Sequence, residues 1–184
     1  KRKNLKVIYD ASHAFGVKYK NKSLLSYGDL SVVSFHATKV LNTFEGGAII
    51  SNKQNVKKRL EDIKNHGIRK EKINYLPALN GKMSEIHAAI GVLQLKHINK
   101  ILRKRNAINN LYLKQLNNIA GIEIIGPPKN TDWNASYFPI LVNKDYPISR
   151  NKLFNTLKRK NIFARLYFYP SLSELNFFKK NKYI

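Results

Sequence analysis

Short apolar, β-branched segments alternate with turn residues over the first fifty positions of the chain. This pattern predicts buried strands at residues 6–9, 30–35 and 48–51. A further short strand is expected at residues 17–20, with Asn21-Lys22 as its turn. The first part of the chain therefore favours a sheet built from short, buried strands.

Helical periodicity replaces this pattern after residue 52. The apolar positions that predict a first helix are Val56, Leu60 and Ile63. Gly67 ends this helix, and a polar loop is expected up to residue 82. A longer amphipathic helix begins after Ser84, a typical N-cap residue, and runs until Gly121. Its apolar positions are Ile86, Ile90, Leu93, Ile101, Ile108, Tyr112 and Leu116.

After Gly121 the pattern becomes that of a small α+β domain. The segments with strand patterns are residues 122–125, 136–142 and 162–166. Ser149 is placed to cap a further helix. We therefore predict an α/β fold in two parts. Residues 1–105 would belong to a large domain with a mainly parallel sheet, and residues 106–184 would form part of a small C-terminal α+β domain.

The charge of the chain is its most unusual global property. Lys and Arg total 34 against 11 Asp and Glu, a formal net charge of +23. Such an excess can indicate a nucleic-acid-binding protein, because phosphate contacts dominate that affinity. The basic residues are nevertheless spread without a concentrated block, and Lys, Asn and Ile are all abundant, as in proteins from AT-rich genomes. Nucleic-acid binding is therefore the weaker interpretation, and a basic surface also attracts nucleotide diphosphates.

Several classes of site are excluded by composition. The chain has no cysteine, which rules out disulfides, thiol nucleophiles and thiolate metal sites. No apolar stretch is long enough for a membrane span, and no signal-peptide core follows the basic residues 1–6, so a cytoplasmic protein is expected. No metal site is predicted either, because the spacing of the other histidines gives no ligand set: His36, His66, His87 and His97.

A carboxylate and a lysine follow two of the predicted strands. Asp10 ends the first strand, and ligands of α/β sheets gather at the carboxyl ends of strands. Asp10 could therefore bind a cationic group. The alternative is that Asp10 is the N-cap of a helix or a turn residue. Lys39 follows the strand at residues 30–35. A partly buried lysine can lose its proton, as a Schiff-base nucleophile must. An exposed loop lysine or a phosphate-binding lysine is the alternative, although no GxxxxGK[ST] pattern supports a P-loop.

Together these segments resemble the DegT/DnrJ/StrS-type nucleotide-sugar aminotransferases, which are pyridoxal-phosphate (PLP) enzymes of fold type I. The matching segments are DASHAFG at 10–16, SFHATK at 34–39, EGG at 45–47 and the pattern NGKMSE…AAIG…QL at 80–95. Residues 165–170 resemble the family's aromatic-proline loop. The resemblance covers essentially the whole chain and implies that the chain corresponds to the middle and later part of a family member.

The resemblance implies a role for each of five residues. Lys39 would form the Schiff base with pyridoxal 5′-phosphate, and Asp10 would pair with the protonated pyridine nitrogen. His13 would hydrogen-bond near the phenolic oxygen of the ring, and Ser34 would bind the cofactor phosphate. Asn80 would reach a phosphate in the neighbouring subunit, which implies a homodimer with shared active sites.

The implied reaction is transfer of an amino group from an amino acid, expected to be glutamate, to a keto-sugar nucleotide for surface polysaccharide synthesis. The lysine of HATK argues against the dehydratase relatives, which carry histidine there. The chain departs from the family in lacking its N-terminal phosphate-cradling turn and ring-stacking aromatic, and in having Lys82 where arginine is common. Trp133 and the cluster 167–169 are interpreted as packing or substrate-loop aromatics, and the cluster could also stack on a nucleotide base.

Two alternatives to an active aminotransferase stay open. The chain could be a non-catalytic fragment or one half of a split enzyme, which the absent N-terminal segments favour. It could also be a basic nucleic-acid-binding protein, which only its net charge favours.

Overall fold

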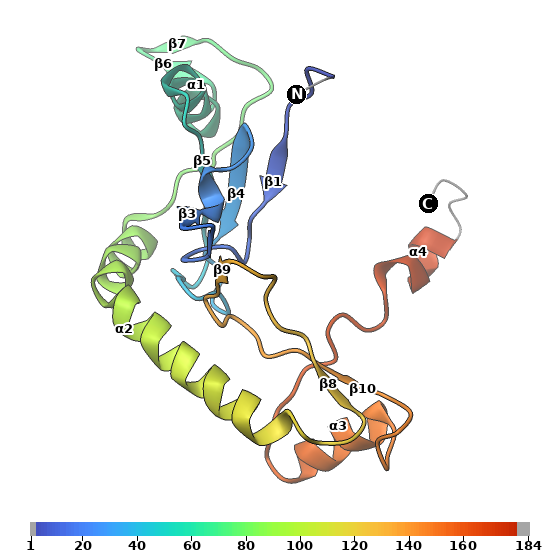
Figure 1. Ribbon diagram of the computed structural model, residues 1–184. Helices are drawn as coiled ribbons and strands as arrows, with labels where there is room; N and C mark the ends of the chain where they lie inside the picture. Colours follow the sequence, from blue (N-terminus) through green and yellow to red (C-terminus); the bar gives the residue numbers. More distant parts are fainter. Residues whose placement is uncertain (1–2, 180–184) are drawn as a thin grey trace. The chain divides into compact units, whose positions relative to one another are not determined.

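The computed structural model describes residues 3–179, and the chain divides into two compact units (Figure 1). Unit 1 comprises Lys1–Gln115 and Gly126–Pro139, and unit 2 comprises Leu116–Ile125 and Ile140–Ile184. This division differs from the predicted boundary at residue 105, because nearly all of the long helix stays with unit 1 and residues 126–139 return to that unit. The assignment of the units to a cofactor domain and a small domain stays a prediction.

Unit 1 is built on a three-stranded sheet with the order β1–β4–β5. The strands are β1 (Ile8–Asp10), β4 (Leu30–Ser34) and β5 (Gly47–Ile50). β1 runs parallel to β4, with Asp10 opposite Val32. β4 and β5 are antiparallel, because the loop between them, residues 35–46, reverses the chain without a crossover helix. The α/β class is as predicted, but the sheet of this chain is not mainly parallel.

The two faces of this sheet differ in exposure. Ser31 and Val33 of β4 point to a covered face and are 0% and 2% exposed. The opposite face carries Ile8, Val32 and Ile49, which are 63%, 40% and 49% exposed. β1 was expected to be buried, and this expectation is wrong for the chain described. The physical reason is that no described element of unit 1 covers this face of the sheet.

Short hairpins surround the sheet in unit 1. Their strands are β2 (Lys18–Tyr19), β3 (Lys22–Ser23), β6 (Ile68–Arg69), β7 (Lys72–Ile73) and β9 (Thr131–Asp132), and a 3-10 helix η1 (Leu24–Ser26) follows β3. β2 pairs antiparallel with both β3 and β9. The β2–β3 turn is Lys20-Asn21, where φ is +48° and +60°, one residue earlier than predicted. The β6–β7 hairpin replaces a predicted polar loop, because two-residue strands are too short to show an alternating pattern.

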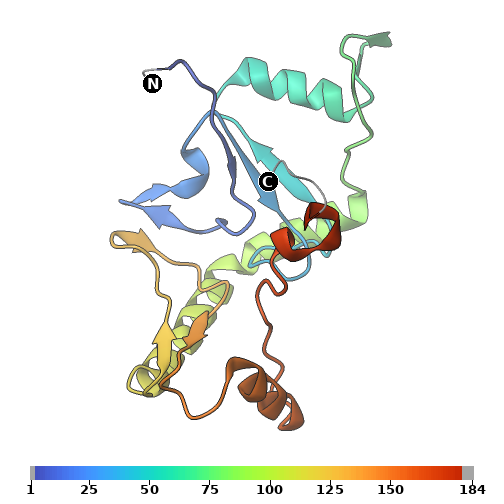
Figure 2. The same ribbon diagram turned by 90° about the vertical axis from the view of Figure 1, so that its right-hand side faces the viewer.

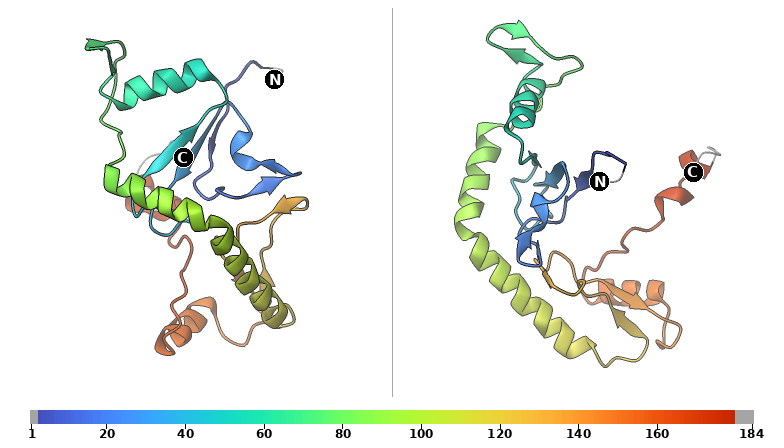
Figure 3. Two further views of the ribbon diagram at one scale, coloured as in Figure 1. Left: turned by 90° about the vertical axis from the view of Figure 1, so that its left-hand side faces the viewer. Right: turned by 45° about the horizontal axis from the view of Figure 1, so that its top comes forward.

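The two predicted helices of the middle segment are both present. α1 spans Gln54–Lys64 and therefore ends three residues before Gly67. α2 spans Glu85–Leu116 as one unbroken helix (Figure 3). Ser84 Oγ accepts a hydrogen bond from the backbone N–H of His87 at 3.4 Å, which confirms the predicted cap. Among the described residues, no helix combines the length and apolar character needed to cross a bilayer.

A partly buried ion pair joins α1 to the β6–β7 hairpin. Asp62 is 5% exposed, and its Oδ1 accepts a hydrogen bond from Arg69 Nε at 2.7 Å. Arg69 also donates to the carbonyl of Lys58 at 3.0 Å. None of the predicted cofactor residues takes part in these contacts.

Unit 2 contains one antiparallel strand pair and one main helix (Figure 2). Its elements are β8 (Ile122–Ile124), β10 (Ile140–Val142), α3 (Arg150–Arg159), η2 (Leu172–Glu174) and α4 (Asn176–Lys179). Ser149 Oγ accepts a hydrogen bond from Lys152 N at 3.3 Å and caps α3 as predicted. The predicted strand at residues 162–166 is wrong. These residues form a loop, because no strand of the described chain pairs with them and Ile162 and Phe163 stay exposed.

Candidate active site

Two neighbouring strands lead into the candidate site. β1 ends at Asp10 and β4 ends at Ser34, and because these strands are parallel their carboxyl ends lie at the same edge of the sheet. The loop after β4 carries Lys39, and the segment after β1 carries His13. The local folds that the sequence predicted thus bring four of the five predicted residues to one edge.

Lys39 stands on a tightly held turn. Its backbone N–H donates to the carbonyl of His36 at 2.9 Å, and its own carbonyl accepts from Asn42 Nδ2 at 3.3 Å. The next two residues, Val40 and Leu41, are each 4% exposed and anchor the turn in the core. The backbone of Lys39 is therefore fixed while its side chain remains partly exposed.

His13 is the direct partner of the Lys39 side chain. Lys39 Nζ lies 2.9 Å from His13 Nε2. An ammonium group can only donate, so the imidazole accepts this bond in its neutral form. Burial, followed by the positive charge of Lys39, lowers the pKa of His13, and the charge of Asp10 opposes this shift. The burial of His13 and the positive charge of Lys39 therefore both favour a neutral imidazole at neutral pH.

Replacing Lys39 with methionine should raise the pKa of His13 toward its ordinary value of about 6.5, because the neighbouring positive charge is removed. An NMR titration of the His13 ring protons measures this change, with Lys22→Met as the control. In the native chain, the pKa of His13 is lower than its ordinary value. The contribution of His13 to the free energy of unfolding is therefore fully present above about pH 6.5 and is progressively lost as the pH falls. An unchanged His13 pKa in Lys39→Met would contradict the contact.

Asp10 presents an ionised carboxylate at the same edge. Its Oδ1 accepts hydrogen bonds from Ser12 Oγ at 2.5 Å and Ser12 N at 3.0 Å. The side-chain bond and then the backbone bond from Ser12 lower the pKa of Asp10, and the charges of His13 and Lys39 lower it further. The side chain is exposed, and within residues 3–179 no cation forms an ion pair with it. Its charge is therefore available to a bound cationic group.

The remaining predicted residues lie in two different places. Ser34 Oγ accepts a hydrogen bond from the backbone N–H of His36 at 3.3 Å, at the start of the turn that carries Lys39. Asn80 is exposed and forms an isolated antiparallel bridge with Asn65, so the structure does not bring it to the other four. Its predicted role in the site of a neighbouring subunit stays a prediction.

Two residues that sequence reasoning missed reach the site from far along the chain. Asn134 is 1% exposed and donates through Nδ2 to the carbonyls of His13 and Phe15, both at 2.8 Å. The Tyr137 ring lies 5.2 Å from the His13 ring, centroid to centroid, at an interplanar angle of 51°. Because 121 positions separate Asn134 from His13, no local pattern could have revealed this contact.

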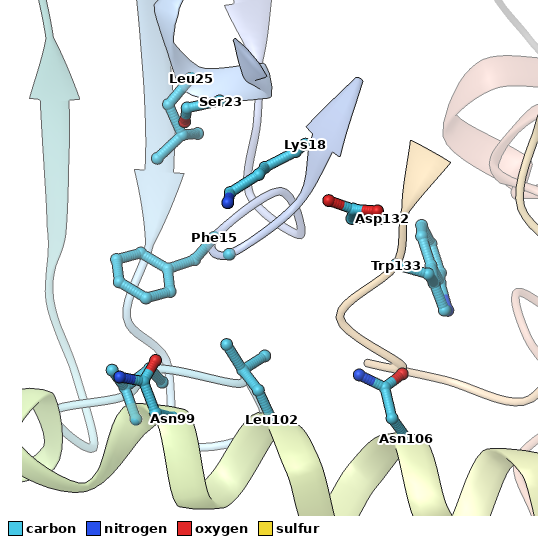
Figure 4. A pocket seen from close by; sticks show the side chains of 11 residues that line it. Phe15, Lys18, Ser23, Leu25, Asn99, Leu102, Asn106, Asp132 and Trp133 are labelled. Atoms are coloured by element: carbon cyan, nitrogen blue, oxygen red, sulfur yellow. The ribbon is translucent and has the colours of Figure 1, made fainter. Parts of the chain in front are cut away.

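A cavity of about 450 Å³ also opens in unit 1 (Figure 4). Leu102 and Asn106 of α2 line one side of it, and Phe15 and Lys18 lie opposite. None of the five predicted cofactor residues lines this cavity, so it is separate from the edge that holds Lys39. In the described part of the chain, no three His, Asp or Glu side chains gather where they could hold a metal ion.

All 184 residues match the sequence model of the DegT/DnrJ/EryC1/StrS aminotransferase family. The chain belongs to this family. It is 53% identical over 172 residues to a dTDP-4-amino-4,6-dideoxy-D-glucose transaminase of Shigella dysenteriae, covering 93% of this chain and 47% of the relative. A transaminase of the same name from Escherichia coli is 44% identical over 179 residues, covering 95% and 47%. A crystal structure of DesI in the presence of its TDP-sugar product has a TM-score of 0.89 at 27% identity, covering 98% of this chain and 46% of that chain.

Family membership confirms the resemblance and the fold class that the motifs predicted. The aminotransferases of this family use PLP, and the side chains at the strand edge suit it. Lys39 supplies an amine, Asp10 an open negative charge and Ser34 a hydroxyl group. The chain spans about half the length of the curated relatives it matches. The roles of the individual residues stay predictions.

Proposed function

We propose that this chain holds PLP at Lys39 and serves an aminotransferase that moves an amino group from glutamate to a keto-sugar nucleotide. The observation that carries the proposal is the 2.9 Å contact of Lys39 Nζ with His13 Nε2, at the strand edge where Asp10 ends β1. The names of the 53% and 44% identical relatives support a dTDP-linked 4-amino-4,6-dideoxy sugar as the product.

Each side chain has a distinct task in this proposal. Bound PLP supplies an electron-withdrawing ring that stabilises negative charge on the neighbouring carbon. Lys39 would hold the cofactor and would move a proton at its Nζ, while neutral His13 would orient that nitrogen through the 2.9 Å hydrogen bond. The carboxylate of Asp10 matches a protonated ring nitrogen, and Ser34 Oγ can donate to the phosphate.

We further propose a homodimer in which Asn80 serves the site of the partner subunit. The support is its position: Asn80 is exposed on the segment before α2 and lies beside Asn65, not beside Lys39. A side chain placed in this way can reach a ligand held by another copy of the chain. Light scattering of the purified chain gives the oligomeric state directly.

The proposal is tested by adding PLP to the purified chain and recording the absorbance spectrum. Binding at Lys39 should change the spectrum of free PLP. Glutamate and a dTDP-linked 4-keto-6-deoxy sugar should then yield the amino sugar, detected by mass spectrometry. A folded chain that leaves the PLP spectrum unchanged would contradict the proposal for this chain.

A second candidate is that the chain acts as one half of a two-part enzyme. The exposed apolar face of Ile8, Val32 and Ile49 favours it, because such a face is normally covered by another element. Adding the half of the Shigella relative that this chain does not span would decide between the two. A PLP spectrum that changes only after this addition supports the two-part enzyme. Nucleic-acid binding stays an untested alternative, to which family membership gives no support.

A further inference from the structure

Asn134 uses all of its side-chain hydrogen-bonding groups inside unit 1. Its Nδ2 donates to the carbonyls of His13 and Phe15 at 2.8 Å each, and its Oδ1 accepts from Ser136 N at 3.1 Å. With 1% exposure, the side chain has no contact with bulk water. Two carbonyls of the partly buried segment after β1 thus depend on a single amide group, and each would be costly to leave unpaired.

The segment that Asn134 holds is the one that carries His13. Fixing the carbonyls of residues 13 and 15 fixes the backbone on both sides of Ala14 and therefore the direction of the His13 side chain. The next residue, Gly16, has a φ of +78°, and a Cβ there would lie 3.3 Å from Leu102 of α2. The segment therefore approaches α2 closely at Gly16, whereas the carbonyls on either side of Ala14 are held by Asn134.

The segment around Asn134 is itself anchored to α2. Arg105 Nη1 donates to the carbonyls of Ala135 and Ser136 at 3.3 and 3.4 Å. Tyr137, three residues after Asn134, places its ring 5.2 Å from that of His13. Residues 134–137 consequently hold His13 at two points, by its backbone and by its ring.

We propose that Asn134 is a positioning residue, which keeps His13 Nε2 within hydrogen-bonding distance of Lys39 Nζ and thereby sets the reactivity of Lys39. Among the described residues, the hydrogen bonds of Asn134 all join backbone groups of residues 13, 15 and 136 and not the side chains of the site. The groups that face His13 are Lys39, Asp10 and Tyr137. The effect on the reaction of Lys39 with PLP rests on the proposed function. The effect on the position of His13 does not.

The test uses Asn134→Ala and Asn134→Leu in the whole chain. Leucine has the same branched arrangement of heavy atoms as asparagine but no hydrogen-bonding groups, so it removes the hydrogen bonds without leaving the space empty. The matched control is Asp62→Ala, which removes another buried polar side chain of unit 1, one that bonds to Arg69 and not to the segments carrying His13 and Lys39. The readouts are the His13 pKa by NMR titration and the rate at which borohydride fixes PLP to Lys39. Circular dichroism verifies folding.

Both Asn134 variants should raise the pKa of His13 toward its ordinary value and slow fixation of PLP at Lys39 about tenfold. The control should change neither quantity. Unchanged readouts in a folded variant, or an equal effect of Asp62→Ala, would overturn the inference. Unfolding of both Asn134 variants would also overturn it, since Asn134 would then serve stability alone. If the native chain does not react with PLP, the proposed function fails, while the His13 titration still decides the role of Asn134.

Discussion

Replacing Lys39 with alanine is expected to abolish covalent fixation of PLP to the chain and, with it, all amino transfer. Lys39 combines a fixed backbone with a partly exposed amine, and its Nζ is oriented by His13 at 2.9 Å. No other group of the described site can replace an amine as the point of covalent attachment. The mass of the intact protein after borohydride treatment measures the effect, which should be complete loss of the added cofactor mass.

Lys22→Ala is the matched control for this experiment. Lys22 lies in the same unit, on the exposed strand β3, and its ammonium lies 5.0 Å from the centroid of the Tyr27 ring, not near His13. This variant should retain the native mass increase. Retention of the full mass increase in Lys39→Ala would show that PLP reacts with surface lysines only and would contradict the assignment.

The second large effect is expected for Asp10→Asn, which should weaken PLP binding by about tenfold to a hundredfold. The substitution keeps the shape of the side chain and its bonds to Ser12 but removes the negative charge that would face the protonated ring nitrogen. In a complete enzyme the rate of amino transfer should fall as well, because a neutral ring withdraws electrons less strongly. A titration of the PLP absorbance change gives the affinity.

Asp132→Asn serves as the control for Asp10→Asn. Asp132 is an exposed carboxylate of unit 1 on strand β9, and the cavity that it lines contains no predicted cofactor residue. Its removal changes the net charge by the same amount and should leave PLP affinity unchanged. Equal affinities of Asp10→Asn and the native chain would show that Asp10 does not face the cofactor ring.

Local sequence patterns predicted the elements that depend mainly on contacts between residues close together in the sequence. The β-branched segment at 30–35 forms β4, and the long apolar periodicity after Ser84 forms α2 up to Leu116. The structure also places Asp10 and Lys39 at one edge of the sheet, since β1 ends at Asp10 and the loop after the parallel strand β4 carries Lys39. Parallel strands place their carboxyl ends together, so this part of the site follows from strand order alone.

Other features depend on contacts that no local pattern encodes. Ile8 looks like a core residue in the sequence, yet it is 63% exposed, because burial of an apolar strand requires a covering element. The segment at 162–166 has strand propensity but no partner strand in the described residues. Asn134 was overlooked because asparagine usually marks turns, and its burial depends on carbonyls 119 and 121 positions away.

The central claim is that Lys39 is the attachment point of the cofactor, and peptide mapping of the native chain tests it most directly. The chain is incubated with PLP, reduced with borohydride and digested, and the modified peptide is identified by mass spectrometry. The account predicts a single dominant modification on Lys39, in the segment SFHATK. A modification spread over the other lysines, or none in a folded protein, would contradict it.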